Sequence, residues 1–346
     1  MQKSIPVMNI LIILISSMLI VSCKDNVTDS TPAVPEGKFK LLFVKADSGK
    51  VTVNTIWSDG SGLKKISDFK DGNRPQWSYD GKYIVYININ YPKTIWVMDS
   101  TGNNPHKIAE GNQFICSPFE NKICFIREEY NKDNFPGWAI YSVNIDGSDL
   151  RQLTDLQYQK SGLKWSSVPS SVYFTLNDNV SGSFQRVCKL DLNDKHIEKL
   201  FEGYDFPQME DCSAKGDYFI FSANHADIYK YEIQSNKVTQ LTNAFNRDEF
   251  AKISPLNSKI VFSSGRDNPA QIYMMNSDGS DQHIITRHKY GAAIPKYSPD
   301  GSMIVYLSSD DGRSGQLTIC DAHGDNPRTL SVLNTYSYEW CPAKGL

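Results

Sequence analysis

Residues 74–87 read RPQWSYDGKYIVYI, and residues 295–307 read PKYSPDGSMIVYL. Both stretches place a proline, an aromatic residue and a serine before an Asp-Gly pair, and a run of β-forming residues follows. Asp-Gly accepts the positive φ angles of a tight turn, and Ile, Val and Tyr favour extended backbone. Each stretch therefore predicts a β-hairpin, and the similarity between the two predicts an internal repeat.

The hairpin motif occurs seven times when the chain is aligned on the residue that precedes its turn. Successive copies are 39 to 49 residues apart, and the aligned positions are Ser78, Ser117, Ser166, Ser213, Ser254, Ser298 and Cys341. After each of the first six copies comes a β-forming stretch that ends in a polar turn, such as IWVMDSTG at 95–102 or IYMMNSDG at 272–279. A short fourth strand follows it. Each unit therefore holds four short strands, at the period of about 44 residues that is typical of propeller blades.

Four-stranded units at this period indicate a β-propeller, in which each unit is one blade. Residues 39–67 supply the last three strands of a blade, whereas residues 335–342 supply an opening strand with no blade after it. Joining the two ends of the chain completes one blade and closes the ring with sheet hydrogen bonds. We predict an all-β fold with a single propeller of seven four-stranded blades. Six or eight blades remain alternatives, because the copies at 166 and 213 match least well.

The repeats resemble the TolB-type repeat, which also builds the propeller domain of dipeptidyl peptidase IV-like enzymes. The resemblance lies in the P-x-W-S-P-D-G hairpin, matched at 75–81 and 295–301, and in the I-Y-x-M-D-x-D-G pattern, matched at 272–279. It covers about residues 38–342. TolB itself has six blades and an additional N-terminal α/β domain. The resemblance implies a propeller and favours contacts with cell-envelope proteins, although propellers host many unrelated functions.

The N-terminal segment has the features of an export signal. Residues 1–22 place Lys3 ahead of an apolar run that is short for a spanning helix, which predicts a signal peptide. The run ends in Ile20-Val21-Ser22-Cys23. This ending resembles the bacterial lipoprotein box and implies that Cys23 is lipidated. A cleaved secretory peptide and an uncleaved anchor are the alternatives.

The lipoprotein interpretation sets the domain limits and the expected location. Residues 23–37 are polar and contain prolines, so we predict a flexible tether between Cys23 and a propeller domain at 38–346. We expect the protein in the bacterial cell envelope, with the lipid anchor as its only membrane contact. The anchor would hold it to the outer membrane, on the periplasmic side or at the cell surface.

Composition and cysteine spacing exclude several classes of ligand. The 346 residues carry a formal charge of −3 without a Lys/Arg cluster, which argues against nucleic acid as a partner. No C-x-x-C pair occurs and the histidines lack metal-ligand spacing, so we expect no metal and no cofactor. The Asp-Gly pairs are interpreted as turns rather than calcium loops. Cys116 and Cys124 flank one hairpin turn and could form a disulfide, but we favour buried thiols.

The catalytic motifs expected of related enzymes are missing from the sequence. A dipeptidyl peptidase-like enzyme needs G-x-S-x-G in a hydrolase domain, and this motif does not occur. We therefore favour a non-catalytic propeller that binds a protein or another envelope partner. The alternative is a carbohydrate- or peptide-active lyase or hydrolase whose site is built from residues of several blades.

A binding surface is expected on the face where the longer loops emerge. In a propeller, the loops between the second and third strands of each blade share one face with the connections to the next blade. Aromatic and arginine side chains, which are enriched at recognition hot spots, gather in these loops. The candidate residues are Tyr130, Phe135, Tyr158, Tyr204, Phe206, Phe245, Arg247, Arg266, Tyr290 and Arg313. The alternative for each aromatic residue is that it fills a gap between blades.

Overall fold

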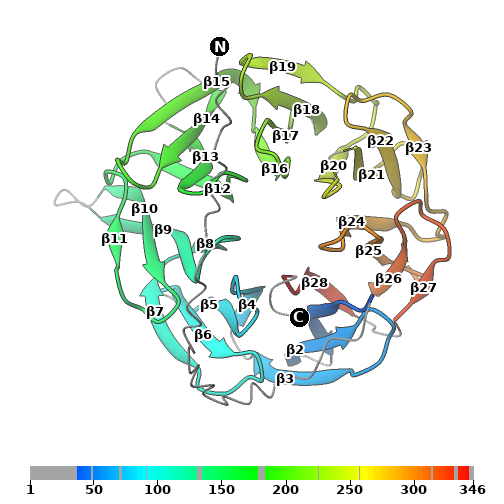
Figure 1. Ribbon diagram of the computed structural model, residues 1–346, viewed down its shortest axis with the longest axis horizontal. Coiled ribbons are helices and arrows are strands. Elements are labelled where there is room, and N and C mark those ends of the chain that lie inside the picture. Colours follow the sequence, from blue (N-terminus) through cyan, green and yellow to red (C-terminus); the bar gives the residue numbers. More distant parts are fainter. Residues whose placement is uncertain are drawn as a thin grey trace, which may run out of the picture. The chain divides into compact units, whose positions relative to one another are not determined.

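The computed structural model describes residues 37–342, except 48–49, 70–71, 91, 131–134, 178–183, 225, 257, 313–314 and 331–333. These residues form 28 strands arranged as seven antiparallel four-stranded sheets in a ring (Figure 1). The predicted all-β propeller is confirmed, and its blade number is seven rather than six or eight. The signal peptide, the tether and the lipidation of Cys23 lie outside the described residues and stay predictions.

The first four blades are built as follows, from the channel outwards. Blade 1 contains β28 (Thr335–Trp340), β1 (Lys40–Asp47), β2 (Lys50–Trp57) and β3 (Lys64–Phe69). Blade 2 contains β4 (Gly72–Trp77), β5 (Tyr83–Asn88), β6 (Thr94–Asp99) and β7 (His106–Glu110). Blade 3 contains β8 (Gln113–Cys116), β9 (Lys122–Tyr130), β10 (Pro136–Asn144) and β11 (Arg151–Gln152). Blade 4 contains β12 (Gln159–Trp165), β13 (Ser171–Asn177), β14 (Phe184–Asp191) and β15 (Ile197–Asp205).

The remaining three blades follow the same order. Blade 5 contains β16 (Gln208–Cys212), β17 (Tyr218–Ala223), β18 (Asp227–Glu232) and β19 (Lys237–Gln240). Blade 6 contains β20 (Asp248–Ile253), β21 (Lys259–Ser264), β22 (Gln271–Asn276) and β23 (His283–Ile284). Blade 7 contains β24 (Ala292–Tyr297), β25 (Met303–Ser308), β26 (Gln316–Asp321) and β27 (Arg328–Thr329).

Ring closure joins the two ends of the propeller, as the sequence predicted. Strand β28 pairs antiparallel with β1, with Trp340 opposite Leu41 and Tyr338 opposite Phe43. All four of these side chains are buried in one cluster with residues of blade 7. The C-terminal strand therefore supplies both the sheet pairing of blade 1 and part of the apolar contact that seals it to blade 7.

The repeated Ser-x-Asp-Gly motif forms the turn that the sequence predicted. In the first copy Ser78 Oγ donates to Asp80 Oδ1 at 2.7 Å and accepts from Tyr83 N at 3.0 Å. In the last full copy Ser298 and Asp300 form the same contact at 2.6 Å. Gly81 and Gly301 have φ of 68° and 76°. The motif therefore closes the first hairpin of blades 2 and 7, because the serine and aspartate satisfy backbone and side-chain groups within the turn.

The core lies between the blades rather than within any one of them. For example, Ile95 and Val97 of blade 2 share a buried cluster with Phe125 and Tyr141 of blade 3. Cys116 and Cys124 are free thiols and form no disulfide. Burial raises the pKa of both thiols far above its ordinary value. The preference for thiols over a disulfide is confirmed.

Candidate functional site

One position of the repeat lines the central channel in all seven blades. This position lies two residues before the serine of the turn and is occupied by Gln76, Ile115, Lys164, Asp211, Lys252, Lys296 and Glu339. We call these seven residues the channel ring. They border two adjoining cavities of about 970 and 560 Å³. Sequence reasoning missed the ring, although the alignment that revealed the repeat also defines this position.

A β-bulge places most of the ring side chains. The pairing between the first and second strands of a blade shifts immediately before Gln76, Lys164, Asp211, Lys252 and Lys296. A bulge changes the direction of the side chains that follow it. The shared position and the shared bulge together explain why these five residues face the channel.

In four of the bulges, the residue two positions before the ring residue has left-handed backbone. Its φ is 54° at Arg74, 64° at Gly162, 57° at Phe250 and 59° at Ile294. A left-handed non-glycine residue costs ~1–2 kcal/mol, and a β-branched one is especially rare. Such strain persists only where neighbouring groups impose it, and it concentrates at functional sites.

Neighbouring blades hold the two strained apolar residues in place. Phe250 N donates to Glu210 Oε1 of blade 5 at 3.3 Å, and Ile294 N donates to Ser263 Oγ of blade 6 at 2.9 Å. The Tyr338 hydroxyl of blade 1 also donates to the carbonyl oxygen of Ile294. Each bulge is therefore fixed by side chains that reach it from the next blade.

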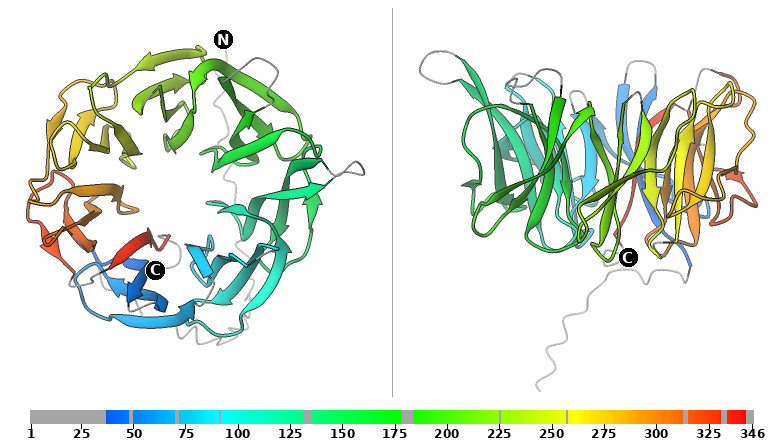
Figure 2. Two further views of the ribbon diagram at one scale, coloured as in Figure 1. Left: turned by 180° about the vertical axis from the view of Figure 1, so that it is seen from behind. Right: turned by 90° about the horizontal axis from the view of Figure 1, so that it is seen from above.

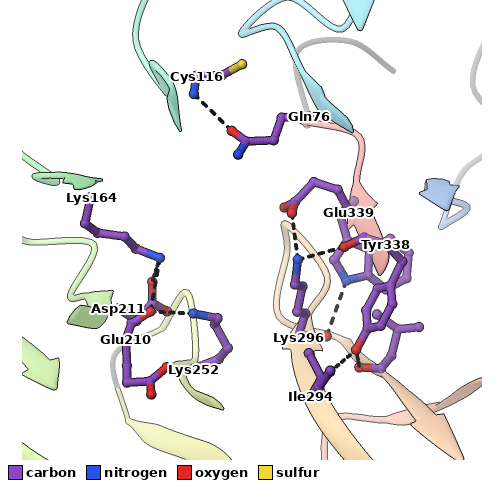
Figure 3. Close-up of polar contacts among 12 residues, drawn as sticks. Gln76, Cys116, Lys164, Glu210, Asp211, Lys252, Ile294, Lys296, Tyr338 and Glu339 are labelled. Carbon is purple, nitrogen blue, oxygen red and sulfur yellow. Dashed lines mark hydrogen bonds and ion pairs between the residues drawn. The ribbon is translucent and has the colours of Figure 1, made fainter. Parts of the chain in front are cut away.

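The charged members of the ring form a continuous arc over blades 4 to 7 and blade 1. Lys164 and Lys252 approach from opposite sides and both donate to the carbonyl oxygen of Glu210 (Figure 3). Lys164 Nζ also lies 3.7 Å from Asp211 Oδ1. Farther along the arc, Lys296 Nζ donates to Glu339 Oε2 at 2.6 Å and to the Tyr338 carbonyl oxygen at 2.7 Å (Figure 3).

The channel environment shifts the pKa of three groups in this arc. Burial, assisted by repulsion from Lys164, lowers the pKa of Lys252 to about 8. Burial, the largest single cause, acts in the same direction on Lys164, but the combined attraction of nearby acidic groups, with Asp211 the strongest, outweighs it, and the pKa of Lys164 is raised. Burial raises the pKa of the Glu210 carboxyl. The arc therefore contains one lysine that loses its proton much more readily than an ordinary surface lysine.

The remaining side of the channel is neutral. Gln76 Nε2 donates to the Phe114 carbonyl oxygen at 3.4 Å, and its Oε1 accepts from Cys116 N at 3.0 Å (Figure 3). Ile115 is the ring residue of blade 3, and its carbonyl oxygen accepts from Trp165 Nε1 at 3.3 Å. These contacts join the innermost strands of neighbouring blades. Those strands form no sheet hydrogen bonds with each other, so ring and tryptophan side chains bridge them instead.

The predicted loop-rich face carries the most exposed aromatic residues. We define it by the loops between second and third strands and by the connections between blades, which emerge on the same side of the ring (Figure 2). Among the described residues, every aromatic side chain that is more than half exposed belongs to this face. These side chains are Tyr130 (55%), Phe135 (67%), Phe206 (65%) and Phe245 (104%). Tyr158 and Tyr290 are also exposed, but by less than half.

The structure places the other candidate residues in different settings. Arg247 is mostly exposed beside Glu249. Arg266 instead donates to the fully buried Asp248 at 2.8 Å, and its guanidinium lies over the rings of Phe262 and Tyr273. Arg313 lies outside the described residues.

Tyr204 is packed rather than presented. Its ring contacts Phe201, Phe221 and Tyr229 with centroid separations of 5.2 to 5.5 Å, within an aromatic cluster between blades 4 and 5. Tyr204 therefore fills a gap between blades, which was the alternative to a role in binding.

Among the members of the predicted set that the structure describes, only Phe206 borders the main channel cavity. Tyr130 borders a separate cavity of about 250 Å³ between blades 2 and 3, together with Arg127, Glu128 and Glu129. Phe250 was missed by the sequence analysis, although it is 39% exposed at the channel. The sequence feature that could have identified Phe250 is its position two residues before the ring residue Lys252.

The described residues contain neither a metal-binding cluster nor a membrane-spanning helix. No group of three or more His, Cys, Asp or Glu side chains is close enough to hold a metal ion in the described part of the chain. Within the same residues, no helix has the length and apolar character needed to cross a bilayer.

The fold and the channel define a seven-bladed propeller with a charged arc on its inner wall and a loop-rich, aromatic face. A family model for the TolB beta propeller domain matches residues 119–342, which is more than half of the chain. The chain therefore belongs to the TolB beta-propeller domain family.

Individual proteins agree with this assignment. The chain is 26% identical over 263 residues to an uncharacterized protein of Agrobacterium fabrum, covering 75% of this chain and 69% of that protein. It is also 26% identical over 267 residues to the Tol-Pal system protein TolB of Helicobacter hepaticus, covering 72% of this chain but only 59% of that TolB.

Among solved structures, an acylaminoacyl peptidase from Pyrococcus horikoshii superposes with a TM-score of 0.65 at 17% identity, covering 85% of this chain and 50% of the peptidase. This likeness shows the fold alone. The propeller resemblance to both TolB and peptidase propellers, inferred from the repeat, is confirmed.

Proposed function

We propose that this chain is a non-catalytic propeller of the bacterial cell envelope that binds a protein partner through its loop-rich face. The observation that carries the proposal is that the described aromatic residues more than half exposed all lie on one face. Phe135, Phe206, Phe245 and Tyr130 all emerge on that face. Large aromatic side chains are energetically costly to leave in water, and they dominate binding hot spots once a partner covers them.

The location in the envelope rests on similarity and on the N-terminal sequence. A relative of this chain is the TolB protein of a Tol-Pal system. The signal-like residues 1–22 and the lipoprotein-like Cys23 suit a protein that is exported and anchored to the outer membrane by lipid. The anchor is tested by replacing Cys23 with alanine: loss of labelling by radioactive palmitate and release from the membrane fraction are expected. Unchanged labelling would contradict it.

The partner is sought by cross-linking intact cells that carry the protein in place of the native copy, followed by capture and mass spectrometry. The test variant is Phe245→Ala with Arg247→Ala, because both side chains are largely exposed and neither is part of a buried cluster. We expect a specific partner to be captured by the native chain and to be depleted at least tenfold by the double variant. The matched control is Leu256→Ala, which removes an exposed side chain from the opposite face.

Equal capture by the double variant and the native chain would place the interaction elsewhere and overturn the assignment of the face. If no protein is captured, and the purified chain instead cleaves a peptide or a glycan, the enzyme alternative replaces the binding function.

A further inference from the structure

Lys252 differs from the other two lysines of the channel ring in its ionic partners. Lys296 donates to the carboxylate of Glu339 at 2.6 Å, and Lys164 lies 3.7 Å from the carboxylate of Asp211. Lys252 donates to a carbonyl oxygen, that of Glu210, and forms no ion pair among the described residues. An ammonium group has three donor hydrogens, so Lys252 retains capacity for an anionic ligand.

The two nearest carboxyl groups are committed to other donors. Asp211 Oδ2 accepts from Ile253 N at 3.0 Å, and its Oδ1 faces Lys164. Glu210 Oε1 accepts from Ser222 Oγ at 2.9 Å and from Phe250 N at 3.3 Å. These hydrogen bonds orient both carboxyl groups within the protein. Movement of either group to pair with Lys252 would leave a backbone N–H without its acceptor, which is costly.

The space beside Lys252 is large enough for a small ligand. The cavity of about 560 Å³ is bordered by all three ring lysines and by the apolar side chains of Phe250, Ile294 and Trp340. Lys252 and Lys296 come from adjacent blades, and each follows a bulge whose left-handed residue is strained. The backbone strain at these two bulges therefore directs two lysine side chains into one cavity.

We propose that this cavity is a binding site for a small oxyanion, with Lys252 as its principal anchor and Lys164 and Lys296 as flanking cations. The ligand class comprises compounds that carry a phosphate, a sulfate or a carboxylate group and whose remaining atoms can lie against Phe250 and Trp340. A cation in a partly dry channel forms stronger charge-assisted hydrogen bonds to such groups than an exposed lysine does. This site is independent of the proposed protein partner.

Binding should depend on pH in a way that identifies Lys252. The charged or titratable groups that face it across the channel are Lys164, Glu210, Asp211, Lys296 and Glu339. Because the pKa of Lys252 lies at about 8, the unliganded site begins to lose its charge near that pH, well below the range of an ordinary lysine. Affinity for an anion is therefore expected to fall as pH rises through about 8, and binding near pH 8 should take up protons.

The experiment is isothermal titration calorimetry of the purified chain with inorganic phosphate, sulfate and succinate in separate titrations at constant ionic strength. Phosphate and sulfate test a tetrahedral oxyanion, whereas succinate tests a carboxylate. At least one probe should bind saturably at pH 7, and Lys252→Gln should weaken it at least tenfold. Lys252→Arg keeps the positive charge and should retain most of the affinity. Lys237→Gln, at the exposed start of β19, is the control for a general loss of positive charge.

Three results would overturn the proposal. One is that none of the three probes binds saturably to the native chain. The second is that Lys252→Gln binds as well as the native chain while its near-ultraviolet circular dichroism shows an unchanged fold. The third is that Lys237→Gln weakens binding as much as Lys252→Gln, since this would mean that the anion responds only to net charge.

Discussion

At the scale of single residues, the glycine that ends the turn between the third and fourth strands fixes how closely two blades approach. A Cβ atom added at Gly102 would lie 2.2 Å from the Ile66 carbonyl oxygen of blade 1, and φ at Gly102 is +92°. The corresponding Gly324 of blade 7 would meet Ile285 of blade 6 at 2.7 Å. The glycine of the repeat therefore serves packing between blades as well as the turn itself.

We predict that Gly102→Ala lowers the free energy of unfolding by about 2–4 kcal/mol, because left-handed strain is added to a backbone clash. The matched control is Gly203→Ala, where φ is +93° but the added Cβ meets nothing within 4 Å. The control should lose only the strain of about 1–2 kcal/mol. Urea denaturation measures both values, and equal losses would show that the contact with Ile66 does not limit the packing.

Residue scale also decides which predicted binding residues remain useful probes. Phe245 and Arg247 are exposed, whereas Tyr204 packs among aromatic rings and Arg266 is paired with a buried carboxylate. Substitution of Tyr204 or Arg266 would disturb the fold and any binding function together. Residue type and loop position could not separate these cases, because burial depends on neighbours that come from another blade.

At the scale of the element, the innermost strand of each blade presents one side chain of the channel ring to the central channel. In blades 6 and 7 the bulge of this strand is strained, at Phe250 and Ile294 respectively. In both strands the residue two positions later is a lysine. Strain of this kind is relieved by glycine but not by alanine, since glycine adopts left-handed backbone at little cost.

We predict that Phe250→Gly is more stable than Phe250→Ala by about 1 kcal/mol, the reverse of the usual order of these two residues within a strand. Both variants remove the same aromatic ring, so their difference isolates the backbone. Thermal and urea unfolding of the two variants measure it. If the alanine variant is the more stable of the two, the bulge at Phe250 is not held in the left-handed conformation.

At the scale of the whole molecule, the last strand of the chain closes the ring. Strand β28 provides the innermost pairing of blade 1 and places Tyr338 and Trp340 in a cluster with Val305 and Leu317 of blade 7. A blade without it would expose both an open sheet edge and an apolar face. The stability of all seven blades therefore depends on a strand of six residues.

We predict that a chain truncated after Asn334 loses cooperative unfolding and elutes as an expanded or aggregated species in size-exclusion chromatography. Truncation after Pro342 keeps β28 and should leave the unfolding transition unchanged. Trp340→Ala should give an intermediate effect of about 3–5 kcal/mol, because it removes a buried indole but leaves the strand pairing. A cooperative, monomeric product of the first truncation would show that the ring does not need its closure.

The sequence by itself determined the repeat, and with it the propeller, the seven blades, the closing strand and the face on which the long loops emerge. These features follow from local chemistry that recurs: Asp-Gly turns with Ser78 or Ser298 before them, and β-forming runs after them. Because the pattern occurs seven times, the repeat can be recognised even though some single copies match it poorly.

Only the tertiary structure decided the channel ring. Its position carries Gln76, Ile115, Lys164, Asp211, Lys252, Lys296 and Glu339, so no shared residue type marks it in the sequence. Its side chains acquire their partners and shifted pKa values from strands that are 38 or more residues away in the chain but close by in the ring. The physical reason is that burial and charge pairing depend on distance in space, and these distances exist only once the ring has closed.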